Sequence, residues 1–487
     1  MNRRTLLLTP PAALLAASAG AADSPEFVVA TGRRQLFLDD AGVAAQERVT
    51  RTLHQPEKRG AVLRSPHPRQ TVQTRTAPIW DPELQKWRLY VLSVDQNLWE
   101  SPDGVNWAPG PVTNQRIDMA VRDAGDPDAQ RRYKAPLTNT GFVVSPDGVH
   151  WTRTPTPAVP SSDEANFSYD PRDGRFLHSV KRRGPFGRAL ALATSRDFRT
   201  WEDYGLVFHT DERDQELGRR KIAARLANPG LQRPELDVPA EYSVQVYNMG
   251  VFWYEGVYLG MPSLFHQSGR VTKDWPDFDR LGLSPAMLAE VRKYGDWTGY
   301  HEVQLVASRD LKNWQRVAER RPFLENSPLG AGAYDIQTII GPSAPIVRDQ
   351  ELWFYYTGIK QYALIRSGNT PGYADYMPDK GAICLAVLRR DGFVSLDAGE
   401  QAGQVVTKSF RCPGGRLHVN ADSAQGEVRV EALDEAGKTL ATSAPLAGDH
   451  LWTAVRWPGE DVAAHRGRRI ALRFHLRRAR LYAYGVE

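Results

Sequence analysis

Cysteine is nearly absent from this chain: its 487 residues include only 2, Cys384 and Cys412. Two thiols close one disulfide at most, which excludes a disulfide-stapled fold and a zinc site built from four thiolates. Charge of one sign is also lacking, since 62 basic residues against 57 acidic ones leave a net charge of +5. Because nothing clusters this small excess, the sequence does not indicate a dedicated nucleic-acid surface.

Aromatic residues and chain-breaking residues are plentiful. The chain holds 13 Trp, 18 Tyr and 16 Phe beside 40 Gly and 34 Pro, but only 6 Met. This mixture favours short aromatic strands separated by turns over long helices. A content of 41% hydrophobic and 24% charged residues is typical of a soluble globular protein, and the length allows two or three domains.

The first 22 residues have the pattern of an export signal. Arg3 and Arg4 precede an apolar run through Ala17, and small residues follow at 19–22. The paired arginines suit the twin-arginine route. A membrane anchor is the alternative, but the run is short and Pro10-Pro11 interrupts it. We therefore expect residues 1–22 to be removed, no membrane span in the rest of the chain, and a periplasmic or secreted protein.

An internal repeat is the strongest signal in the sequence. Four segments share the frame Ser-x-Asp-x-x-x-Trp: Ser101 to Trp107, Ser145 to Trp151, Ser195 to Trp201, and Ser308 to Trp314, with a degenerate fifth copy at 390–393. The frame predicts a tight turn after a strand, in which the Ser and Asp side chains bind local backbone N–H groups. A glycine in the turn permits positive φ, and the Trp covers the edge of the unit.

Each frame follows a second shared element, an acidic turn and then an aromatic strand. In the first three units Asp81, Asp126 and Asp170 lie 22, 21 and 27 residues before the Asp of the frame. This spacing suits four-stranded propeller blades. It predicts five blades, at about 65–110, 111–157, 158–208, 240–320 and 333–398, with the strand 35–38 completing the last one. A β-sandwich with coincidental turn motifs is the alternative.

The pattern of apolar and polar residues changes after Gly399. Alternating apolar and polar residues, as in 427–432 and 470–476, predict a small antiparallel β-sandwich. The predicted fold is therefore all-β, with an export signal at 1–22, a five-bladed β-propeller at 23–400 and a C-terminal β-sandwich at 401–487. Polar insertions at 209–240 and 268–298 predict rim loops with short helices, most clearly at 285–294.

The repeats resemble those of the five-bladed propeller glycosidases, the clan of invertases, levansucrases and arabinanases. They are one residue shorter between Asp and Trp than the sialidase Asp-box. The segments 36–40, 53–58 and 389–397 also resemble exported bacterial proteins that carry a glycosidase-like propeller and a C-terminal sandwich. The resemblance covers nearly all of the mature chain and implies the architecture, whereas chemistry has to be found in the site itself.

Glycoside hydrolysis needs two carboxyl groups at the mouth of the propeller channel, one protonated and one ionised. Acids that lie before the acidic turns are the candidates for catalysis: Asp118 in blade two, Glu164 in blade three, Glu241 in blade four and Asp335 in blade five. Blade one offers only Gln73 and Arg75, whereas the better-known relatives have an Asp there. An acid at the start of a strand is more often a turn or cap group than a catalyst.

Five further residues are candidates for substrate binding, because the strand pattern places them beside these acids: Arg75, Asp163, Asn166, Glu302 and Gln337. Asn166 would share a strand face with Glu164, and Gln337 with Asp335. Like-charge repulsion from Asp163 is expected to raise the pKa of one carboxyl of the pair. Glu302 joins the pocket or only pairs with an arginine.

The leading hypothesis is an exported glycoside hydrolase that acts on a poly- or oligosaccharide. A non-catalytic carbohydrate-binding propeller and an inorganic-phosphate-dependent glycoside phosphorylase are the alternatives, and Lys181-Arg182-Arg183 is the possible phosphate cluster of the latter. We expect a carbohydrate partner and neither nucleic acid nor a protein partner. No cofactor is expected, and a structural Ca²⁺ has no motif of its own.

Overall fold

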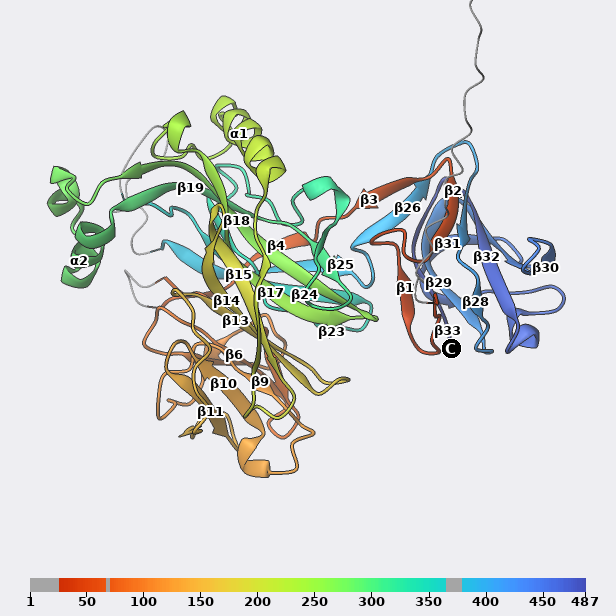
Figure 1. The fold of residues 1–487 in the computed structure, drawn as a ribbon, viewed down its shortest axis with the longest axis horizontal. Helices are drawn as coiled ribbons and strands as arrows, with labels where there is room; N and C mark the ends of the chain where they lie inside the picture. The colour runs from red at the N-terminus through yellow and green to blue at the C-terminus, as the bar shows by residue number, and fades with distance from the viewer. Residues whose placement is uncertain (1–25, 67–70, 365–378) are drawn as a thin grey trace, which may run out of the picture.

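The computed structural model describes residues 26–66, 71–364 and 379–487 (Figure 1). In these residues the strands form six antiparallel sheets: five with four or five strands each, and one with eleven. The five smaller sheets are the blades of a five-bladed β-propeller, and the eleven-stranded sheet lies beside them. The predicted all-β fold class is confirmed. The predicted export signal at 1–22 lies outside the described residues.

Blades one to three follow the chain from the innermost strand outward. Blade one contains β5 (Ile79–Asp81), β6 (Lys86–Tyr90), β7 (Leu98–Ser101) and β8 (Ala108–Pro109). Blade two contains β9 (Val121–Arg122), β10 (Tyr133–Leu137), β11 (Gly141–Ser145) and β12 (Thr152–Arg153). Blade three contains β13 (Ala165–Asp170), β14 (Arg175–Gly184), β15 (Gly187–Ser195) and β16 (Glu202–Phe208).

The last two blades carry one extra strand each. Blade four contains β17 (Ser243–Tyr254), β18 (Val257–Val271), β20 (Val306–Ser308) and β21 (Gln315–Arg316), and β19 (Asp296–Val303) pairs with β18. Blade five contains β22 (Thr338–Ile340), β24 (Glu351–Ile359), β25 (Gly381–Arg389) and β4 (Glu57–Arg64), and β23 (Ile346–Arg348) pairs with β24.

The repeated Ser-x-Asp-x-x-x-Trp frames form the turns that the sequence predicts. In all four, the Ser hydroxyl lies 3.0 Å from an Asp carboxylate oxygen, and that oxygen accepts two backbone N–H groups farther along the turn. Gly104 and Gly148 adopt positive φ in the first two frames. In the other two the same position is filled by Phe198 and Leu311, whose side chains are buried in the core. Burial of these side chains offsets the strain of a non-glycine residue there.

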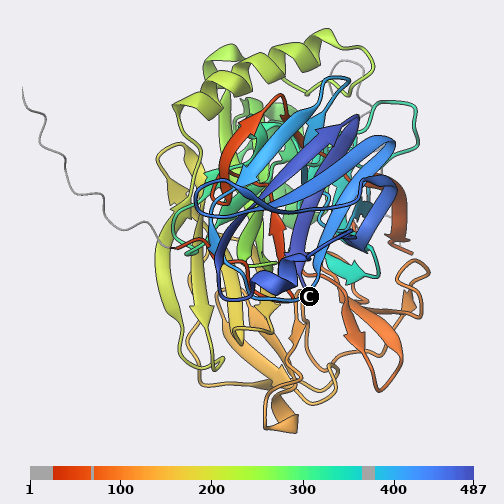
Figure 2. The ribbon, with the colours of Figure 1, turned by 90° about the vertical axis from the view of Figure 1, so that its right-hand side faces the viewer.

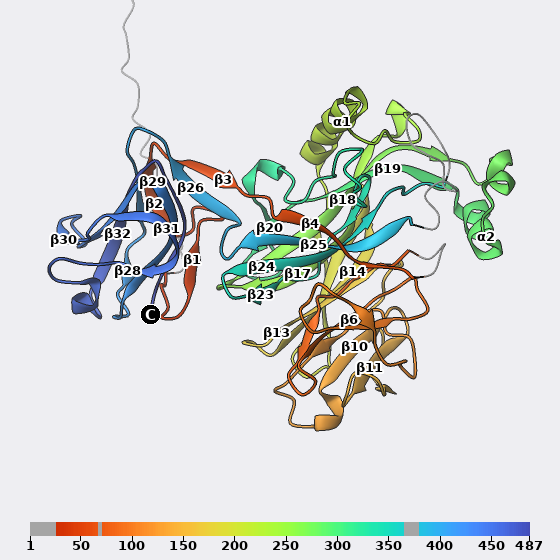
Figure 3. The ribbon, with the colours of Figure 1, turned by 180° about the vertical axis from the view of Figure 1, so that it is seen from behind.

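The strand that closes the ring is β4, and the prediction that residues 35–38 close it is wrong. β4 pairs with β25 at the outer edge of blade five, so the last blade combines residues 57–64 with residues 338–389 (Figure 3). β1 (Arg34–Leu36) pairs instead with β33 (Ala479–Val486) of the large sheet. The neighbouring Phe37 is buried in the core of that sheet.

The eleven-stranded sheet curls around its own apolar core, and it takes strands from both ends of the described chain (Figure 2). Its N-terminal strands are β1, β2 (Val43–Glu47) and β3 (Thr50–Leu53). The others are β26 (Val394–Ala398), β27 (Gly403–Thr407), β28 (Phe410–Arg411), β29 (Leu417–Leu433), β30 (Thr439–Thr442), β31 (Leu446–Ala454), β32 (Arg469–Arg477) and β33. Residues 34–53 are therefore part of this sheet rather than of a blade.

Both polar insertions contain a helix, as predicted. α1 (Glu212–Ala227) begins with a capping box in which Asp211 and Asp214 bind each other's backbone N–H groups, and α2 (Pro285–Tyr294) begins after Ser284. Short 3-10 turns complete the helical residues: η1 (Ala129–Arg131), η2 (Pro239–Glu241), η3 (Pro276–Leu281), η4 (Ala318–Arg320) and η5 (Val462–His465). No helix in the described ranges is long and apolar enough to cross a membrane.

Candidate functional site

The mouth of the channel is the end of the propeller at which the innermost strands begin. Arg75, Asp118, Glu164 and Gln337 lie just before β5, β9, β13 and β22, the first strands of their blades. Because the first strands of a propeller run in the same direction along the channel, these four residues belong to one face of the molecule. This face is the candidate active site.

Arg75 and Glu164 form the central contact of the mouth. Nε of Arg75 lies 2.5 Å from one carboxylate oxygen of Glu164, and Nη2 lies 2.8 Å from the other. Both side chains are largely buried, with 2% and 13% of their surfaces exposed. Burial raises the pKa of Glu164, but the charge and hydrogen bonds of Arg75 outweigh it, so the pKa lies below its usual value. Glu164 is therefore ionised at neutral pH.

A second ion pair lies beside the first. Lys181 on β14 places its ammonium 2.8 Å from a carboxylate oxygen of Asp163 and 3.9 Å from the ring centre of Tyr247. The rise expected in the pKa of one carboxyl of this pair does not occur at Glu164, because separate cations hold the two carboxylates. The charge of Lys181 and a hydrogen bond with Tyr247 lower the pKa of Glu164 further.

Asn166 lies at the centre of a hydrogen-bond network that joins four blades below the mouth. Its amide nitrogen donates to Ser343 (2.8 Å), whose hydroxyl donates to the carbonyl of Arg75 (2.5 Å), and its amide oxygen accepts from Asn248 (3.0 Å). Only 2% of Asn166 is exposed. In this arrangement the Asn166 side chain supports the backbone that carries Arg75.

Two of the predicted acids lie near the surface. Asp118 pairs with Arg116 at 2.8 Å, with 38% of its side chain exposed, and its negative charge helps to raise the pKa of Arg75. Asp118 therefore lies near the central ion pair. Glu241 ends the turn η2 in the insertion before β17 and is exposed, and its backbone carbonyl accepts from Gln267.

Asp335 is buried within blade five. Its carboxylate lies 2.7 Å from Nζ of Lys58 on the closing strand and accepts the Tyr356 hydroxyl at 2.9 Å. Residues 335–336 form a turn rather than a strand, so Asp335 and Gln337 do not share a face as the sequence pattern suggested. The carboxylate joins β4 to the interior of its blade.

Gln337 binds a carboxyl group, that of Glu235, which the sequence pattern did not identify. Nε2 of Gln337 lies 2.9 and 3.0 Å from the two carboxyl oxygens of Glu235, and its amide oxygen accepts the backbone N–H of Tyr362. Glu235 is 2% exposed. Burial, reinforced by the charge of Asp296, raises the pKa of Glu235 to about 8. Among the described carboxyl groups, Glu235 is the one whose pKa is raised.

Rings from blade four and from the chain after β24 pack between Glu164 and Glu235. His301 stacks on Phe265 at 4.6 Å and meets the rings of Tyr247 and Tyr362, each at 4.9 Å. Burial first, and then the positive charge of Arg188, lowers the pKa of His301 well below its usual value, so its imidazole is neutral. Neither of its ring nitrogens finds a hydrogen-bond partner within the described ranges.

Glu302, the next residue, points to a different set of partners. Its carboxylate is paired with Lys221 of α1 and lies 3.3 Å from Nε2 of His266. Burial raises its pKa, but the charges of His266 and Lys221 outweigh this and lower it to about 2. The arginine partner that the sequence suggested is a lysine from the insertion.

A cavity of about 270 Å³ opens beside these rings. Its wall includes Asp163, Arg188, Tyr247, Asp296, Trp297 and Tyr362. The wall therefore contains one residue of the Lys181–Asp163 ion pair and the Tyr247 ring that contacts both Lys181 and Glu164. Within residues 26–66, 71–364 and 379–487, no group of three or more His, Cys, Asp or Glu side chains is arranged to hold a metal ion.

Comparison with known proteins finds similar folds at low identity. No protein-family model and no curated protein sequence matches the chain. Among solved structures, the catalytic domain of an α-L-arabinofuranosidase from Coprinopsis cinerea is 11% identical, with a TM-score of 0.39, over 69% of this chain and 97% of that one. A β-fructofuranosidase of Bombyx mori is 9% identical, with a TM-score of 0.35, over 88% of this chain and 94% of that one.

A third similar solved structure is an enzyme of a different kind. It is an N-acetylgalactosamine deacetylase from F. plautii, 15% identical, with a TM-score of 0.35, over 75% of this chain and 96% of that one. Two glycosidases and a deacetylase thus share this level of similarity with the chain. The reaction has to follow from the residues of the site.

Proposed function

We propose that this protein is a glycoside hydrolase that cleaves a poly- or oligosaccharide at the mouth of the propeller channel. The observation that carries the proposal is a pair of carboxyl groups with opposite pKa shifts: Glu164, lowered by Arg75, and Glu235, raised to about 8 by burial. At neutral pH one is ionised and the other protonated, which is the combination that glycoside hydrolysis requires.

The two carboxyl groups are connected through the same cluster of rings. Tyr247 hydrogen-bonds with Glu164, and its ring contacts that of Tyr362, with centres 6.2 Å apart. The backbone N–H of Tyr362 binds Gln337, which binds Glu235. Glu235 therefore lies behind the part of the cavity wall that Tyr362 forms.

In the proposed reaction Glu235, which lies behind the cavity wall, passes its proton through a water molecule to the oxygen of the leaving sugar. Glu164 either attacks the anomeric carbon or takes a proton from a water molecule that does so. Arg75 keeps Glu164 ionised, and Lys181 adds positive charge on the same side. The neutral His301 is fully buried against Tyr247 and Tyr362 and brings no further charge to the site.

The cavity beside the mouth suits a sugar. Trp297, Tyr247 and Tyr362 supply flat apolar faces, and Asp163, Asp296 and Arg188 supply hydrogen-bonding groups around them. Sugar rings combine an apolar face with a rim of hydroxyl groups, so a wall of this composition binds both parts. The predicted export signal, with a periplasmic or secreted location, remains part of the proposal, because polysaccharides are met outside the cytoplasm.

A non-catalytic carbohydrate-binding propeller is the second candidate. One observation favours it: four of the acids singled out in the sequence are each paired with a cation, in the pairs Arg75–Glu164, Lys181–Asp163, Arg116–Asp118 and Lys58–Asp335. A carboxylate held this firmly also serves as a structural group. Such a propeller would retain a saccharide without cleaving it.

The basic run 181–183, on which the phosphorylase alternative depends, is divided between the two faces of β14. Lys181 binds Asp163, whereas Arg182 is paired with Asp203 on β16. Neighbouring strand residues face opposite sides of the sheet, which separates the two charges. Adding phosphate to the reaction remains a simple check.

Hydrolysis of a panel of furanosides and pyranosides, with and without inorganic phosphate, tests the proposal. We expect the wild type to release sugar without phosphate, and Glu164→Gln and Glu235→Gln to lower the rate at least 100-fold. Glu431→Gln is the matched control, because Glu431 pairs with Arg473 in the distant C-terminal sheet. Unchanged turnover in both mouth variants would remove the assignment, and retention without turnover would favour the binding propeller.

A further inference from the structure

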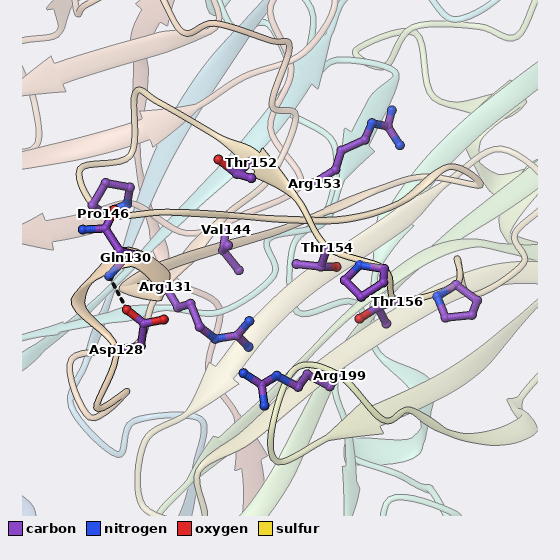
Figure 4. A pocket seen from close by; sticks show the side chains of 12 residues that line it. Asp128, Gln130, Arg131, Val144, Pro146, Thr152, Arg153, Thr154, Thr156 and Arg199 are labelled. Atoms are coloured by element: carbon purple, nitrogen blue, oxygen red, sulfur yellow. Dashed lines mark hydrogen bonds between the residues drawn. The ribbon is translucent and has the colours of Figure 1, made fainter.

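A second large cavity lies between blades two and three, on the face of the propeller opposite the mouth. Figure 4 shows the side chains that line it. Its volume is about 630 Å³, within the range of ligand-binding clefts. One side is η1, which connects β9 to β10, and the other is the turn between β15 and β16. Both connections leave the ends of strands that are farthest from the mouth, so the cavity is separate from the proposed active site.

Three arginines line this cavity, against one acidic residue, Asp128. The carboxylate of Asp128 already accepts the backbone N–H of Gln130 at 2.9 Å. Arg131 comes from blade two, Arg199 from blade three and Arg153 from β12. Because Arg131 is also paired with Asp126, the positive charge that no described ion pair offsets in the groove is that of Arg153 and Arg199.

Arg131 and Arg199 point toward one another across the cavity (Figure 4). Arg131 is held in place, since its Nη2 donates to the carbonyl of Asp197 at 3.1 Å and its Nε lies 3.3 Å from Asp126. The guanidinium of Arg199 makes no hydrogen bond or ion pair with any residue that the structure describes. Two like charges that face each other repel, and an anion between them would bind both.

The rest of the wall supplies hydroxyl groups and small apolar surfaces but no ring on which a nucleic-acid base could stack. Thr152 and Thr154 supply hydroxyl groups, and Pro146, Pro155 and Pro157 supply small apolar surfaces. No aromatic residue is among the lining residues, whereas single-stranded nucleic acids are held largely by stacking on aromatic rings.

We propose that this groove binds an acidic polysaccharide, with a carboxylate or sulfate of the chain between Arg131 and Arg199. The site would hold the protein on an anionic glycan while the mouth on the other face stays open. Binding in the groove does not depend on hydrolysis at the mouth, so this proposal is tested independently of the proposed function.

Affinity measurements with three polymers of one backbone test this proposal: dextran, carboxymethyl-dextran and dextran sulfate. We expect the full chain to bind at least one of the two anionic polymers and not dextran, and the better of the two identifies the anionic group. Arg199→Gln should weaken this binding about tenfold, because it removes one of the two charges that hold the anion. Arg199 is exposed, so its loss should leave the fold intact. Arg213→Gln, which removes an exposed arginine of α1, should bind as the wild type does.

Three results would overturn the proposal: equal binding of dextran, no binding of any of the three polymers, or equal affinities for Arg199→Gln and the wild type. Tighter binding of a single-stranded oligonucleotide that also depends on Arg199 would contradict the choice of a polysaccharide. Repeating the measurement with Glu164→Gln separates the two sites, because the groove should bind equally well when the mouth is inactive.

Discussion

Arg75 and Glu164 join blade one to blade three by two hydrogen bonds, although blade two lies between them in the chain. Arg75 lies in blade one at the position for which the family resemblance implies an acid. Its partner is the carboxylate that we propose acts in catalysis. The same contact thus stabilises the mouth and sets the charge of the proposed site.

Removal of Glu164 should leave the guanidinium of Arg75 buried without its partner. We expect Glu164→Leu to lower the free energy of unfolding by about 3–5 kcal/mol, because an uncompensated buried charge is costly. Urea unfolding of Glu164→Leu, Arg75→Met and the double variant measures this. The double variant should lose less unfolding free energy than the two single variants lose together. Additive losses would show that the two residues do not interact.

Glu235 should make stability depend on pH. Its pKa is about 8 in the folded protein and about 4.5 in the unfolded chain. Between these values only the unfolded chain loses this proton, so the contribution of Glu235 to the free energy of unfolding falls as pH rises, by up to about 1.4 kcal/mol per pH unit. Lys380, with a pKa lowered to about 8 by burial, stays protonated in both states below that pH and adds little there.

Below about pH 6.5 His54, His178 and His301, whose pKa values burial lowers, change the free energy of unfolding in the opposite direction, so urea unfolding at pH 6.5, 7, 7.5 and 8 measures this slope. Glu235→Gln should remove most of the fall between pH 6.5 and pH 8, whereas Glu431→Gln should leave it. Equal slopes in wild type and Glu235→Gln would mean that Glu235 is ionised in the folded protein, which would also remove it as the proposed acid.

The blades could be predicted because their turns are local. The Ser and Asp side chains of each frame bind backbone groups only two or three residues away, so the sequence pattern and the structure coincide. The closing strand could not be predicted in this way. β4 is an outer edge strand and most of its residues are exposed or half-exposed, so it carries little apolar pattern, while the apolar segment around Phe37 is buried in the other sheet.

The site was predictable only in part. Glu164 and Arg75 precede first strands, and the spacing of the repeat identified them. Glu235 lies in the insertion before β17, outside any repeat, and its environment is created by Gln337, which is 102 residues later in the chain. Partners of Asp335 and Glu302 likewise come from distant elements, Lys58 and Lys221. Long-range pairing of this kind leaves no periodic signal.

The closing strand should depend on the contact between Lys58 and Asp335. Lys58→Met leaves the buried carboxylate of Asp335 with Tyr356 as its remaining donor among the described contacts, so we expect a loss of about 1–3 kcal/mol in the free energy of unfolding. Lys58→Arg, which keeps the charge, should lose less. Thermal and urea unfolding measure both, and equal stability of Lys58→Met and the wild type would contradict this role.

Trp297 should contribute to binding rather than to bond cleavage. Loss of its ring from the cavity wall should raise the KM of Trp297→Ala about 2- to 10-fold and leave kcat within about twofold, as expected for one aromatic face. Trp80→Ala, which removes a partly exposed ring on β5 of blade one, is the control. A fall in kcat with unchanged KM would assign Trp297 a different role.

The rate of saccharide hydrolysis as a function of pH tests the central claim most directly. If Glu164 acts ionised and Glu235 acts protonated, the rate should fall as pH rises through about 8, and Glu235→Gln should lose both the activity and this upper limb. A wild-type protein that retains saccharides but releases no sugar at any pH would contradict the account. An unchanged profile in Glu235→Gln would contradict it as well.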